Sequence, residues 1–334
     1  MSSLKVGIVG LPNVGKSTLF NALLKRQQAY VANFPFATIE PNVGVVPVPD
    51  ARLASLAKTI KESEGMNSFP PEVAATVEFV DIAGLIAGAH KGEGLGNKFL
   101  SHIREVDAIC HVVRFFADTD IIKEGSIDPK SDFERVKTEL DLADFEMVEK
   151  HKTKKKDKID EESLPLFSKK PILVVLNVSE SDLKDATKIE IEYAQKLGLK
   201  TDQVIAISAK IESELSDLNE SDQKTYMDDL GIKESGLERL TKKAFETLGL
   251  ITFLTAGVKE VRAWTIPNGI DAQNAAGVIH TDFIKKFIKA DVIDFKDFVE
   301  VGGWKNAREK GKVRSEGRDY LVKDGDVIEF KIGS

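Results

Sequence analysis

The stretch GLPNVGKS, from Gly10 to Ser17, constrains the fold of this 334-residue chain more than any other feature. It matches the pattern Gly-x4-Gly-Lys-Ser, in which a glycine-rich turn surrounds phosphate oxygens with backbone N–H groups. The apolar run LKVGIVG precedes it, and STLFNALLKR follows it with leucines spaced as on one face of a helix. Strand, turn and helix in this order predict a nucleoside triphosphate site in a doubly wound α/β domain with a mostly parallel sheet.

The chemistry of triphosphate binding assigns roles within this loop. The Lys16 ammonium is expected to bridge the β- and γ-phosphates and so to take part in catalysis, and the Ser17 hydroxyl is expected to bind Mg²⁺. Asn13 offers a side-chain carbonyl that would help to hold a monovalent cation such as K⁺ against the phosphates. The nucleotide-binding residues predicted here are Asn13, Val14, Gly15, Lys16, Ser17 and Thr18.

Two later motifs would complete the metal site. EFVDIAGL ends a strand in Asp-x-x-Gly, so Asp81 is expected to hold Mg²⁺ through water and the Gly84 N–H to face the γ-phosphate. Thr38 lies in the Pro-flanked loop NFPFATIEPN, where it would reach Mg²⁺ and the γ-phosphate only when a triphosphate is bound, as in a switch loop. The predicted metal ligands are therefore Ser17, Thr38 and Asp81.

The residue after Gly84 bears on hydrolysis. Small GTPases usually place a Gln there to orient the attacking water, whereas this chain has Leu85, whose apolar side chain cannot do so. His90 follows in the glycine-rich stretch GLIAGAHKGEGLG. Two interpretations of His90 stay open on the residues alone: a solvated loop histidine, or a group that swings in to position water.

The run KKPILVVLNVSE indicates which base is bound. Residues 171–176 within it are uniformly apolar, as a central parallel strand is, and Asn177 follows them directly. Guanine-binding proteins have Asn-Lys-x-Asp here, but this chain has Val178 for the Lys and the longer Glu180 for the Asp. Adenine offers an amino group and N7, which Asn177 and nearby backbone would meet, so the sequence favours ATP. A later strand, VIAISAK, ends in Ser208 and Ala209 and is expected to reach the same sheet edge.

Taken together, GLPNVGKS, NFPFATIEPN, DIAGL, GEGLGNKFL, NVSE and SAKIESEL closely resemble the motifs of the Obg-like ATPases of the YchF subfamily, and the resemblance covers nearly the whole chain. It implies that Asn177 and Glu180 flank the base and that Ser17 and Thr38 ligate Mg²⁺. It also implies that His90 serves as a catalytic residue in place of the missing Gln. The family is a class of P-loop translation factors that prefer ATP over GTP and bind the ribosome.

The middle of the chain predicts a helical insertion over about residues 118–170. DPKSDFERVKTELDLADFEMVEK has apolar residues at helical spacing and passes into a lysine-rich run at 150–158. That run is either a solvated helix end or an arm that contacts RNA phosphates. The resemblance implies a coiled-coil-like antiparallel helical hairpin here, shorter at its tip than is usual in the family.

From LITFLTAG onward the chain changes character. Short alternating segments and turn signals surround one helix-like stretch, IHTDFIKKFI, which predicts a small mixed sheet around a helix. TAGVKEVRAWTIPNG and AAGVIHTDF resemble the TGS domain, a ubiquitin-like β-grasp module. We therefore predict an Obg-type nucleotide-binding domain over residues 1–250 and a TGS domain over 251–334. The basic segment 304–318 is a second candidate RNA-binding patch.

Composition limits the classes of protein that this chain can belong to. A net charge of −7 argues against a protein coated by nucleic acid, so any RNA contact needs a local patch. No apolar run is long enough to span a bilayer, and the single cysteine, Cys110, suits a reducing cytosol. We expect a cytoplasmic, monomeric, Mg²⁺-dependent ATPase that binds the ribosome or large-subunit RNA. Two alternatives stay open: a GTPase of the same fold, and a nucleotide-gated adaptor with negligible hydrolysis, which Leu85 favours.

Overall fold

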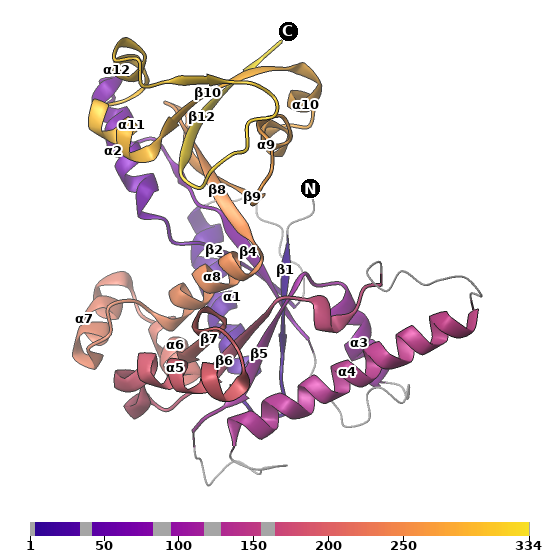
Figure 1. Ribbon diagram of the computed structural model, residues 1–334. Helices are drawn as coiled ribbons and strands as arrows, with labels where there is room; N and C mark the ends of the chain where they lie inside the picture. The colour runs from indigo at the N-terminus through magenta and orange to yellow at the C-terminus, as the bar shows by residue number, and fades with distance from the viewer. Residues whose placement is uncertain (1–3, 34–41, 83–94, 117–127, 155–163, 334) are drawn as a thin grey trace. The chain divides into compact units, whose positions relative to one another are not determined.

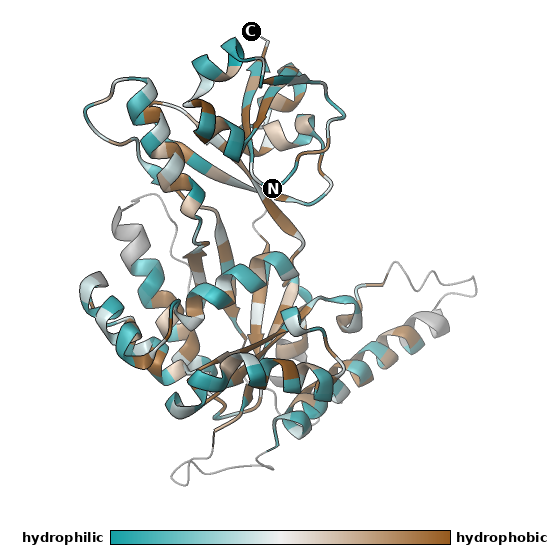
Figure 2. Ribbon diagram, turned by 60° about the vertical axis from the view of Figure 1, so that its left-hand side comes forward, coloured by the Kyte–Doolittle hydropathy of each residue, from teal (hydrophilic) through white to brown (hydrophobic). Residues whose placement is uncertain are grey.

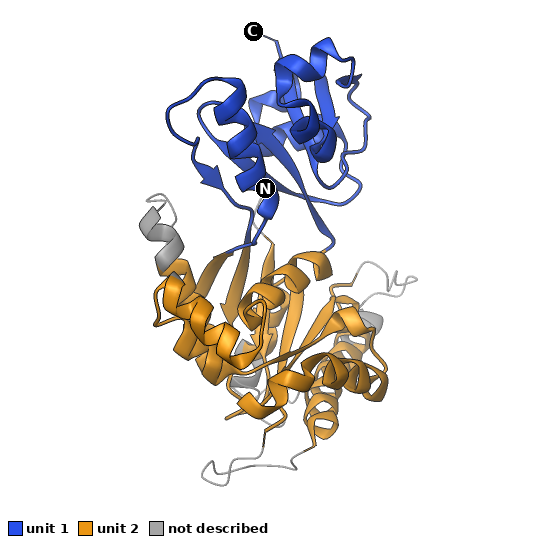
Figure 3. Ribbon diagram, turned by 90° about the vertical axis from the view of Figure 1, so that its left-hand side faces the viewer, with its two compact units in different colours: residues 1–2, 47–76, 249–334 blue, residues 3–46, 77–248 orange. Residues whose placement is uncertain are grey.

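The computed structural model describes residues 4–33, 42–82, 95–116, 128–154 and 164–333 (Figure 1). Three predicted site residues, Thr38, Gly84 and His90, lie outside this described part, as do the side chains of the basic run at 150–158. The chain divides into two compact units, coloured separately in Figure 3. Unit 1 comprises Met1–Ser2, Pro47–Thr76 and Gly249–Ser334, and unit 2 comprises Ser3–Val46 and Val77–Leu248.

Unit 2 is built on a six-stranded sheet with the order β2-β4-β1-β5-β6-β7. Neighbouring strands from β4 to β7 pair in parallel, and β5, β6 and β7 are almost wholly buried, as strands covered on both faces must be. The strands are β1 (Lys5–Val9), β2 (Val43–Pro47), β4 (Thr76–Asp81), β5 (Ala108–Arg114), β6 (Ile172–Asn177) and β7 (Val204–Ile207).

Helices cover both faces of this sheet, which confirms the predicted doubly wound fold. Two apolar clusters join one face to α3, α4 and α5. Ala206 of β7 belongs to the second cluster, whereas its neighbour Ile207 points to the opposite face and lies against Gly236 at the start of α8. The helices of unit 2 are α1 (Lys16–Asn33), α3 (Leu95–Arg104), α4 (Pro129–Lys154), α5 (Ala186–Leu197), α6 (Ala209–Leu215), α7 (Glu220–Leu230) and α8 (Gly236–Thr247).

The predicted helical insertion corresponds to α4, which runs for 26 residues. Its inner face buries Phe133, Val136 and Leu140, while Phe145 is exposed, and Figure 2 shows the resulting mixture of apolar and polar residues along the helix. The chain re-enters the described part at residue 164 and forms only a short 3₁₀ turn, η3 (Phe167–Lys169), before β6. Within the described residues the insertion is therefore one long helix. Asp144 of α4 fixes η3 by accepting from the N–H groups of Phe167 at 2.7 Å and Ser168 at 2.9 Å.

Unit 1 contains a mixed six-stranded sheet with the order β11-β10-β12-β8-β9-β3. Helix α9 (Ala272–Ile279) packs on it, since Ala272, Ala275 and Ala276 share an apolar cluster with Phe253 and Ile266. The strands are β3 (Glu72–Val73), β8 (Leu250–Ala256), β9 (Val261–Pro267), β10 (Phe287–Asp294), β11 (Arg314–Glu316) and β12 (Asp326–Ile332). The other helices are α2 (Ala51–Ser63), α10 (Asp282–Lys286), α11 (Phe295–Val301) and α12 (Trp304–Glu309).

One helical prediction in unit 1 is wrong in detail. The stretch IHTDFIKKFI at 279–288 forms only the short helix α10, and the main helix is α9, which precedes it. From Phe287 onward the chain becomes β10, because it pairs antiparallel with β12 along its whole length. Long-range strand pairing has overridden the local helical pattern.

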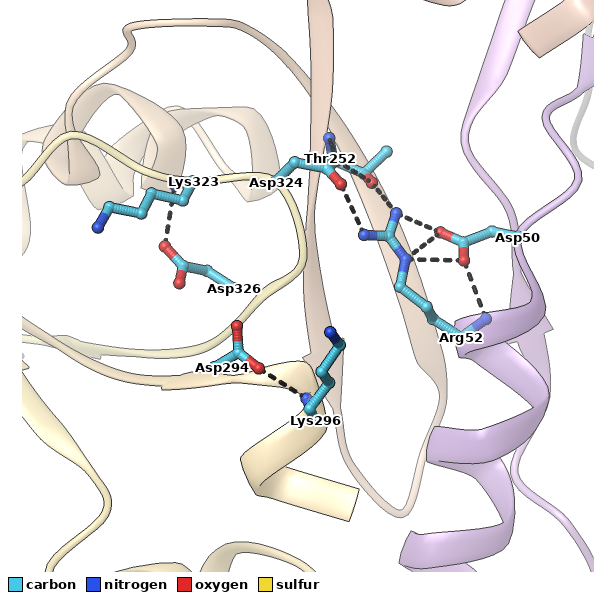
Figure 4. A network of polar contacts seen from close by, with 8 residues as sticks. All are labelled: Asp50, Arg52, Thr252, Asp294, Lys296, Lys323, Asp324 and Asp326. Atoms are coloured by element: carbon cyan, nitrogen blue, oxygen red, sulfur yellow. Dashed lines mark hydrogen bonds and ion pairs between the residues drawn. The ribbon is translucent and has the colours of Figure 1, made fainter. Parts of the chain in front are cut away.

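Residues 47–76 belong to unit 1, which differs from the predicted division of the chain at residue 250. The reason is a set of contacts that link α2 and β3 to the C-terminal strands. The Arg52 guanidinium donates to Asp50 Oδ2 at 2.8 Å, to Asp324 Oδ2 at 2.8 Å and to Thr252 Oγ1 at 2.7 Å (Figure 4). In addition, β3 extends the sheet by pairing in parallel with β9. None of the helices in the described ranges is long and apolar enough to cross a membrane.

Candidate nucleotide-binding site

The phosphate loop connects β1 to α1 and requires glycine at two positions. Gly10 has φ +153°, and a Cβ there would lie 2.3 Å from the carbonyl oxygen of Val112 in β5. Gly15 has φ +96°, and a Cβ there would lie 2.2 Å from Nδ2 of Asn177 in β6. Both glycines therefore adopt backbone conformations that disfavour other residues, and both leave room for an adjacent strand. The loop lies tightly against the carboxyl ends of β5 and β6.

Asn177 joins this loop to the segment that follows β7. Its side chain is only 5% exposed; Nδ2 donates to the carbonyl of Val14 at 2.9 Å, and Oδ1 accepts from the N–H of Ala209 at 3.0 Å. Three motifs that are far apart in the sequence thus meet at one amide group. Its amide nitrogen and oxygen each make one hydrogen bond to protein backbone, and the predicted contact of Asn177 with adenine stays a prediction. Asn177 thereby links the phosphate loop to the residues that follow β7.

Lys16 and Asp81 lie near each other: Asp81 ends β4, and Lys16 follows the phosphate loop after the adjacent strand β1. Lys16 is the first residue of α1, is 8% exposed, and donates from Nζ to the carbonyl of Leu11 at 2.7 Å. Burial lowers the pKa of Lys16, and the nearby Asp81 carboxylate partly offsets this. Burial raises the pKa of Asp81, and the Lys16 ammonium opposes that shift. The site therefore brings together a buried ammonium and a half-buried carboxylate, groups that can bind a phosphate and a metal cation.

The first turn of α1 presents groups suited to phosphate and Mg²⁺. Ser17 and Thr18 are exposed there, and the N–H groups of the first turn have no partners within the helix. Mg²⁺ usually keeps several waters and takes one or two protein oxygens, so the Ser17 hydroxyl with the half-buried Asp81 carboxylate fits such an ion. Asn13 is exposed in the loop with φ +61°, and its predicted role beside a monovalent cation stays a prediction.

The residues predicted to distinguish the base differ in accessibility. Val178 is 2% exposed and packs in the apolar cluster of β6, β7 and α5, while its N–H donates to the carbonyl of Ile207 at 2.9 Å. Its side chain is therefore not placed to stack on a base, because the residue after β6 turns inward. Glu180 begins the 3₁₀ turn η4 (Glu180–Asp185) and is exposed. Ser208 and Ala209 are buried at the start of α6.

Two further groups at this edge were missed by sequence reasoning. The N–H of Phe115 donates to the carbonyl of Asn177 at 3.0 Å. The residues that follow β5 therefore lie beside residues 177–180, the loop predicted to contact the base, which we call the base-side loop. The Arg114 guanidinium lies 4.6 Å from the ring centre of half-buried Phe116 and donates from Nε to its carbonyl at 3.1 Å. The available signal was the aromatic pair in VVRFF, directly after an apolar strand.

His111 in β5 was also missed. It is 1% exposed and stacks on Phe133 of α4 with ring centres 5.4 Å apart. Burial, with a smaller contribution from the Lys16 charge, lowers the pKa of His111 to about 3. The imidazole is therefore neutral at physiological pH.

Comparisons with known proteins place the chain in a family. A family model described as 50S ribosome-binding GTPase matches residues 5–178, and the model YchF-GTPase_C, described as a protein of unknown function (DUF933), matches residues 250–333. The chain is 45% identical to "Ribosome-binding ATPase YchF" of Bacillus subtilis over 374 aligned residues, covering 98% of this chain and 99% of the relative. It is 44% identical to the protein of the same name from Escherichia coli O157:H7, with 98% of each covered.

A solved structure agrees with these relatives. "Structure of the Schizosaccharomyces pombe YchF GTPase" matches with a TM-score of 0.82 and 34% identity, covering 98% of each chain. The alignment with the B. subtilis relative extends over 374 positions, more than the 334 residues of this chain, so that relative contains residues with no counterpart here. Since the identity, the coverage and the fold agree from end to end, the chain belongs to the YchF family of P-loop nucleoside triphosphatases.

Proposed function

We propose that this protein is a Mg²⁺-dependent ATPase that binds the ribosome and acts as a nucleotide-controlled factor in translation or stress. The observation that carries the enzymatic part is the junction at Asn177, which holds the phosphate loop at Val14 against the loop at Ala209. Lys16 and Asp81 lie near each other. The relatives named ribosome-binding ATPases support both parts of the proposal.

The preference for ATP over GTP rests on what the base-side loop presents. Val178 is buried where a guanine-binding protein has a Lys whose stem stacks on the base. Glu180 is exposed on a 3₁₀ turn, and its side chain is longer than the Asp that reads guanine. Neither residue supplies the rigid carboxylate and stacking stem that guanine needs. The aromatic ring of Phe116 and the backbone near Asn177 suit adenine as well as guanine, so the base preference follows from the missing guanine contacts.

For hydrolysis, we assign the Lys16 ammonium to the β- and γ-phosphates and the N–H groups of the first turn of α1 to their oxygens. Ser17 and Asp81, with Thr38, would hold Mg²⁺, whose charge offsets that of the phosphates when it is bound. Gly84 would contact the γ-phosphate through its N–H, and His90 would position the attacking water in place of a Gln. Asn13 would help to hold a monovalent cation.

Ribosome binding is proposed to use RNA contacts from basic side chains of unit 1. In the predicted patch at 304–318, Arg308 pairs with Glu329, Lys312 with Asp297 and Arg314 with Asp326. Lys305, Lys310 and Arg318 are also exposed, and none of these three has an ion-pair partner among the residues that the structure describes. We therefore assign phosphate contacts to these three, with the lysine-rich run at 150–158 as a second contact.

We further propose that residues 251–334 are a TGS-type β-grasp module and that the protein is a cytoplasmic monomer. The mixed sheet packed on α9 supports the first of these assignments.

Phosphate release from ATP and from GTP, with Mg²⁺ and with excess EDTA, tests the enzymatic proposal. We expect Mg²⁺-dependent turnover of ATP and slower turnover of GTP. The nucleotide-gated adaptor is the second candidate, because Leu85 stands where an orienting Gln would be. His90→Ala separates the two: a fall in turnover supports the ATPase, whereas turnover that is negligible in both proteins supports the adaptor.

A further inference from the structure

Unit 2 contains a cavity of about 650 Å³ that is separate from the nucleotide-binding site. It lies between α4 and the C-terminal end of α5. Ile109 and Ile172, near the starts of β5 and β6, are among the residues that line it. Ile172 and Asn177 are the two ends of β6, about 16 Å apart at the rise of a β-strand. The cavity therefore approaches the edge of the sheet opposite to the phosphate loop, and none of the predicted nucleotide-binding residues lines it.

The cavity follows from the way the two helices pack. Val136 and Leu140 of α4 belong to one apolar cluster, whereas α5 belongs to the other. Ile172 contacts both clusters and lies at the seam between them. The part of the wall formed by these residues is therefore apolar, and the stacked rings of His111 and Phe133 extend it. Because His111 is neutral at physiological pH, this wall suits an uncharged aromatic or aliphatic body.

Charged groups line the rest of the cavity, and the lysines outnumber the acids. Lys137, Lys170 and Lys196 come from three different segments, against Glu134 and Asp141 from α4. Two of the lysines already have carboxylate partners on their own helices: Lys137 lies 2.7 Å from Asp141, and Lys196 lies 2.6 Å from Glu192.

Lys170 differs from the other two. Its Nζ donates to the carbonyls of Arg104, at 3.2 Å, and Val106, and it has no carboxylate ion pair within the described part of the chain. Burial lowers the pKa of Lys170, with partial compensation from Asp107. A half-buried ammonium at the wall of a partly apolar cavity, hydrogen-bonded to carbonyl groups and without an ion-pair partner among the described residues, attracts an anion more strongly than a fully exposed lysine does.

We propose that this cavity binds a small amphipathic anion, with an apolar body against Ile109, Ile172 and the His111–Phe133 pair and an anionic group at Lys170. The volume is in the range of pockets that bury most of a small organic ligand. The recognised chemistry is an aryl or alkyl body that carries one carboxylate, sulfonate or phosphate. Lys137 and Lys196 also line the cavity and add positive charge to it.

The test uses 8-anilinonaphthalene-1-sulfonate as the probe, with the nucleotide-binding site filled by saturating Mg²⁺ and ADP. N-phenyl-1-naphthylamine has the same aromatic body without the sulfonate and serves as the uncharged control. Fluorescence titration of the full chain should show a single saturable site for the sulfonate and weaker binding of the amine.

Two variants and two matched controls locate that site. Thr138→Trp introduces a large side chain at an exposed position of α4 that lines the cavity, and should abolish binding of both probes. Lys170→Met should weaken binding of the sulfonate by about tenfold, the loss expected for one charged contact, and leave binding of the amine unchanged. Arg135→Trp and Lys224→Met, at exposed positions outside the cavity, should bind both probes like the unmodified protein.

Retained ADP binding and an unchanged melting temperature show that each variant is folded. The proposal is overturned if the probe binds only when ADP is left out, if Thr138→Trp binds it like the unmodified protein, or if binding to the unmodified protein is weak and unsaturable. It is also overturned if Lys170→Met weakens both probes equally. If Lys170→Met has a lower melting temperature than the unmodified protein, probe binding by Thr138→Trp compared with Arg135→Trp tests the proposal without it.

Discussion

The side chain of Asn177 donates to the carbonyl of Val14 across 2.9 Å, so a residue at the end of β6 holds the phosphate loop in place. The same amide accepts from the N–H of Ala209. The phosphate loop and the segment that follows β7 are thus connected through one buried group. A change at Asn177 should therefore affect both the stability of unit 2 and its affinity for nucleotide.

Replacement of Asn177 by Ala tests this connection. The change leaves the buried Val14 carbonyl and the Ala209 N–H without partners, so we expect a loss of about 2–4 kcal/mol in the free energy of unfolding. Nucleotide affinity should fall by about tenfold or more, because both loops lose their support. Urea unfolding and titration calorimetry measure the two effects. An affinity unchanged from that of the unmodified protein would show that the loops hold their positions without the amide.

Gly15→Ala should act through the same contact. A Cβ at Gly15 would lie 2.2 Å from Nδ2 of Asn177, and the backbone there has φ +96°. Gly231→Ala is the matched control: φ is +70° and nothing lies within 4 Å of the added Cβ, so only the backbone strain of about 1–2 kcal/mol applies. We expect Gly15→Ala to destabilise the protein more than the control and to abolish ATP binding. Equal losses of stability in the two variants would contradict the close packing of Gly15 on Asn177.

Lys16→Met should stabilise the nucleotide-free protein while abolishing ATP binding. The pKa of Lys16 is lowered by burial in the folded state, which means that folding opposes its charged form. Between that lowered pKa and the ordinary value, the unfolded chain binds more protons, so this group makes stability rise with pH in the alkaline range.

Thermal and urea unfolding from neutral to alkaline pH check this prediction for Lys16. The stabilisation by Lys16→Met should be largest near neutral pH. It should shrink as the pH rises from the lowered pKa of Lys16 in the folded state to its ordinary pKa in the unfolded chain. A variant less stable than the unmodified protein throughout would show that the hydrogen bond to Leu11 outweighs the cost of desolvation.

Lys305, Lys310 and Arg318, which have no ion-pair partner among the described residues, should determine the salt dependence of ribosome binding. Replacing Lys305, Lys310 and Arg318 together by Ala should reduce the slope of log affinity against log salt by about 2–3, since each phosphate contact contributes about 0.7–0.9. A charge-matched control removes three exposed lysines elsewhere, at positions 58, 188 and 224. Sedimentation with large ribosomal subunits over a range of salt concentrations measures both triple variants. An equal reduction of slope in the control would mean that net charge alone is responsible.

The sequence predicted the framework of unit 2 because its motifs fix local geometry. A glycine-rich turn between an apolar strand and a helix has few alternative structures, so β1, the phosphate loop and α1 were predictable. The carboxyl ends of β6 and β7 were expected at one edge of a parallel sheet, and Asn177 does meet Ala209 there. What could not be predicted was that the Asn177 amide faces protein backbone.

Features that depend on long-range packing were harder to predict from the sequence. Whether Val178 faces a ligand or the core depends on its packing with β7 and α5, since the local capping box of Ser179 and Asp182 fixes only the turn that follows it. The assignment of residues 47–76 to unit 1 depends on Arg52 reaching Asp324 and on β3 pairing with β9, contacts that span most of the chain. The predicted roles of Thr38, Gly84 and His90 fall outside the described residues and stay predictions.

The base preference can be reversed if the account of the base-side loop is right. The double variant Val178→Lys and Glu180→Asp restores the pattern Asn-Lys-x-Asp, and it should move affinity from ATP towards GTP. Glu180→Gln removes the charge without creating a guanine contact and should leave GTP binding weak. If the double variant binds GTP no better than this control does, the buried position of residue 178 prevents the guanine-type arrangement.

The most direct test of the central claim is titration calorimetry of the unmodified protein with Mg²⁺ and non-hydrolysable analogues of ATP and GTP. We predict that the ATP analogue binds at least tenfold more tightly, a difference of about 1.4 kcal/mol. Equal or tighter binding of the GTP analogue would contradict the account and would identify the protein as a GTPase.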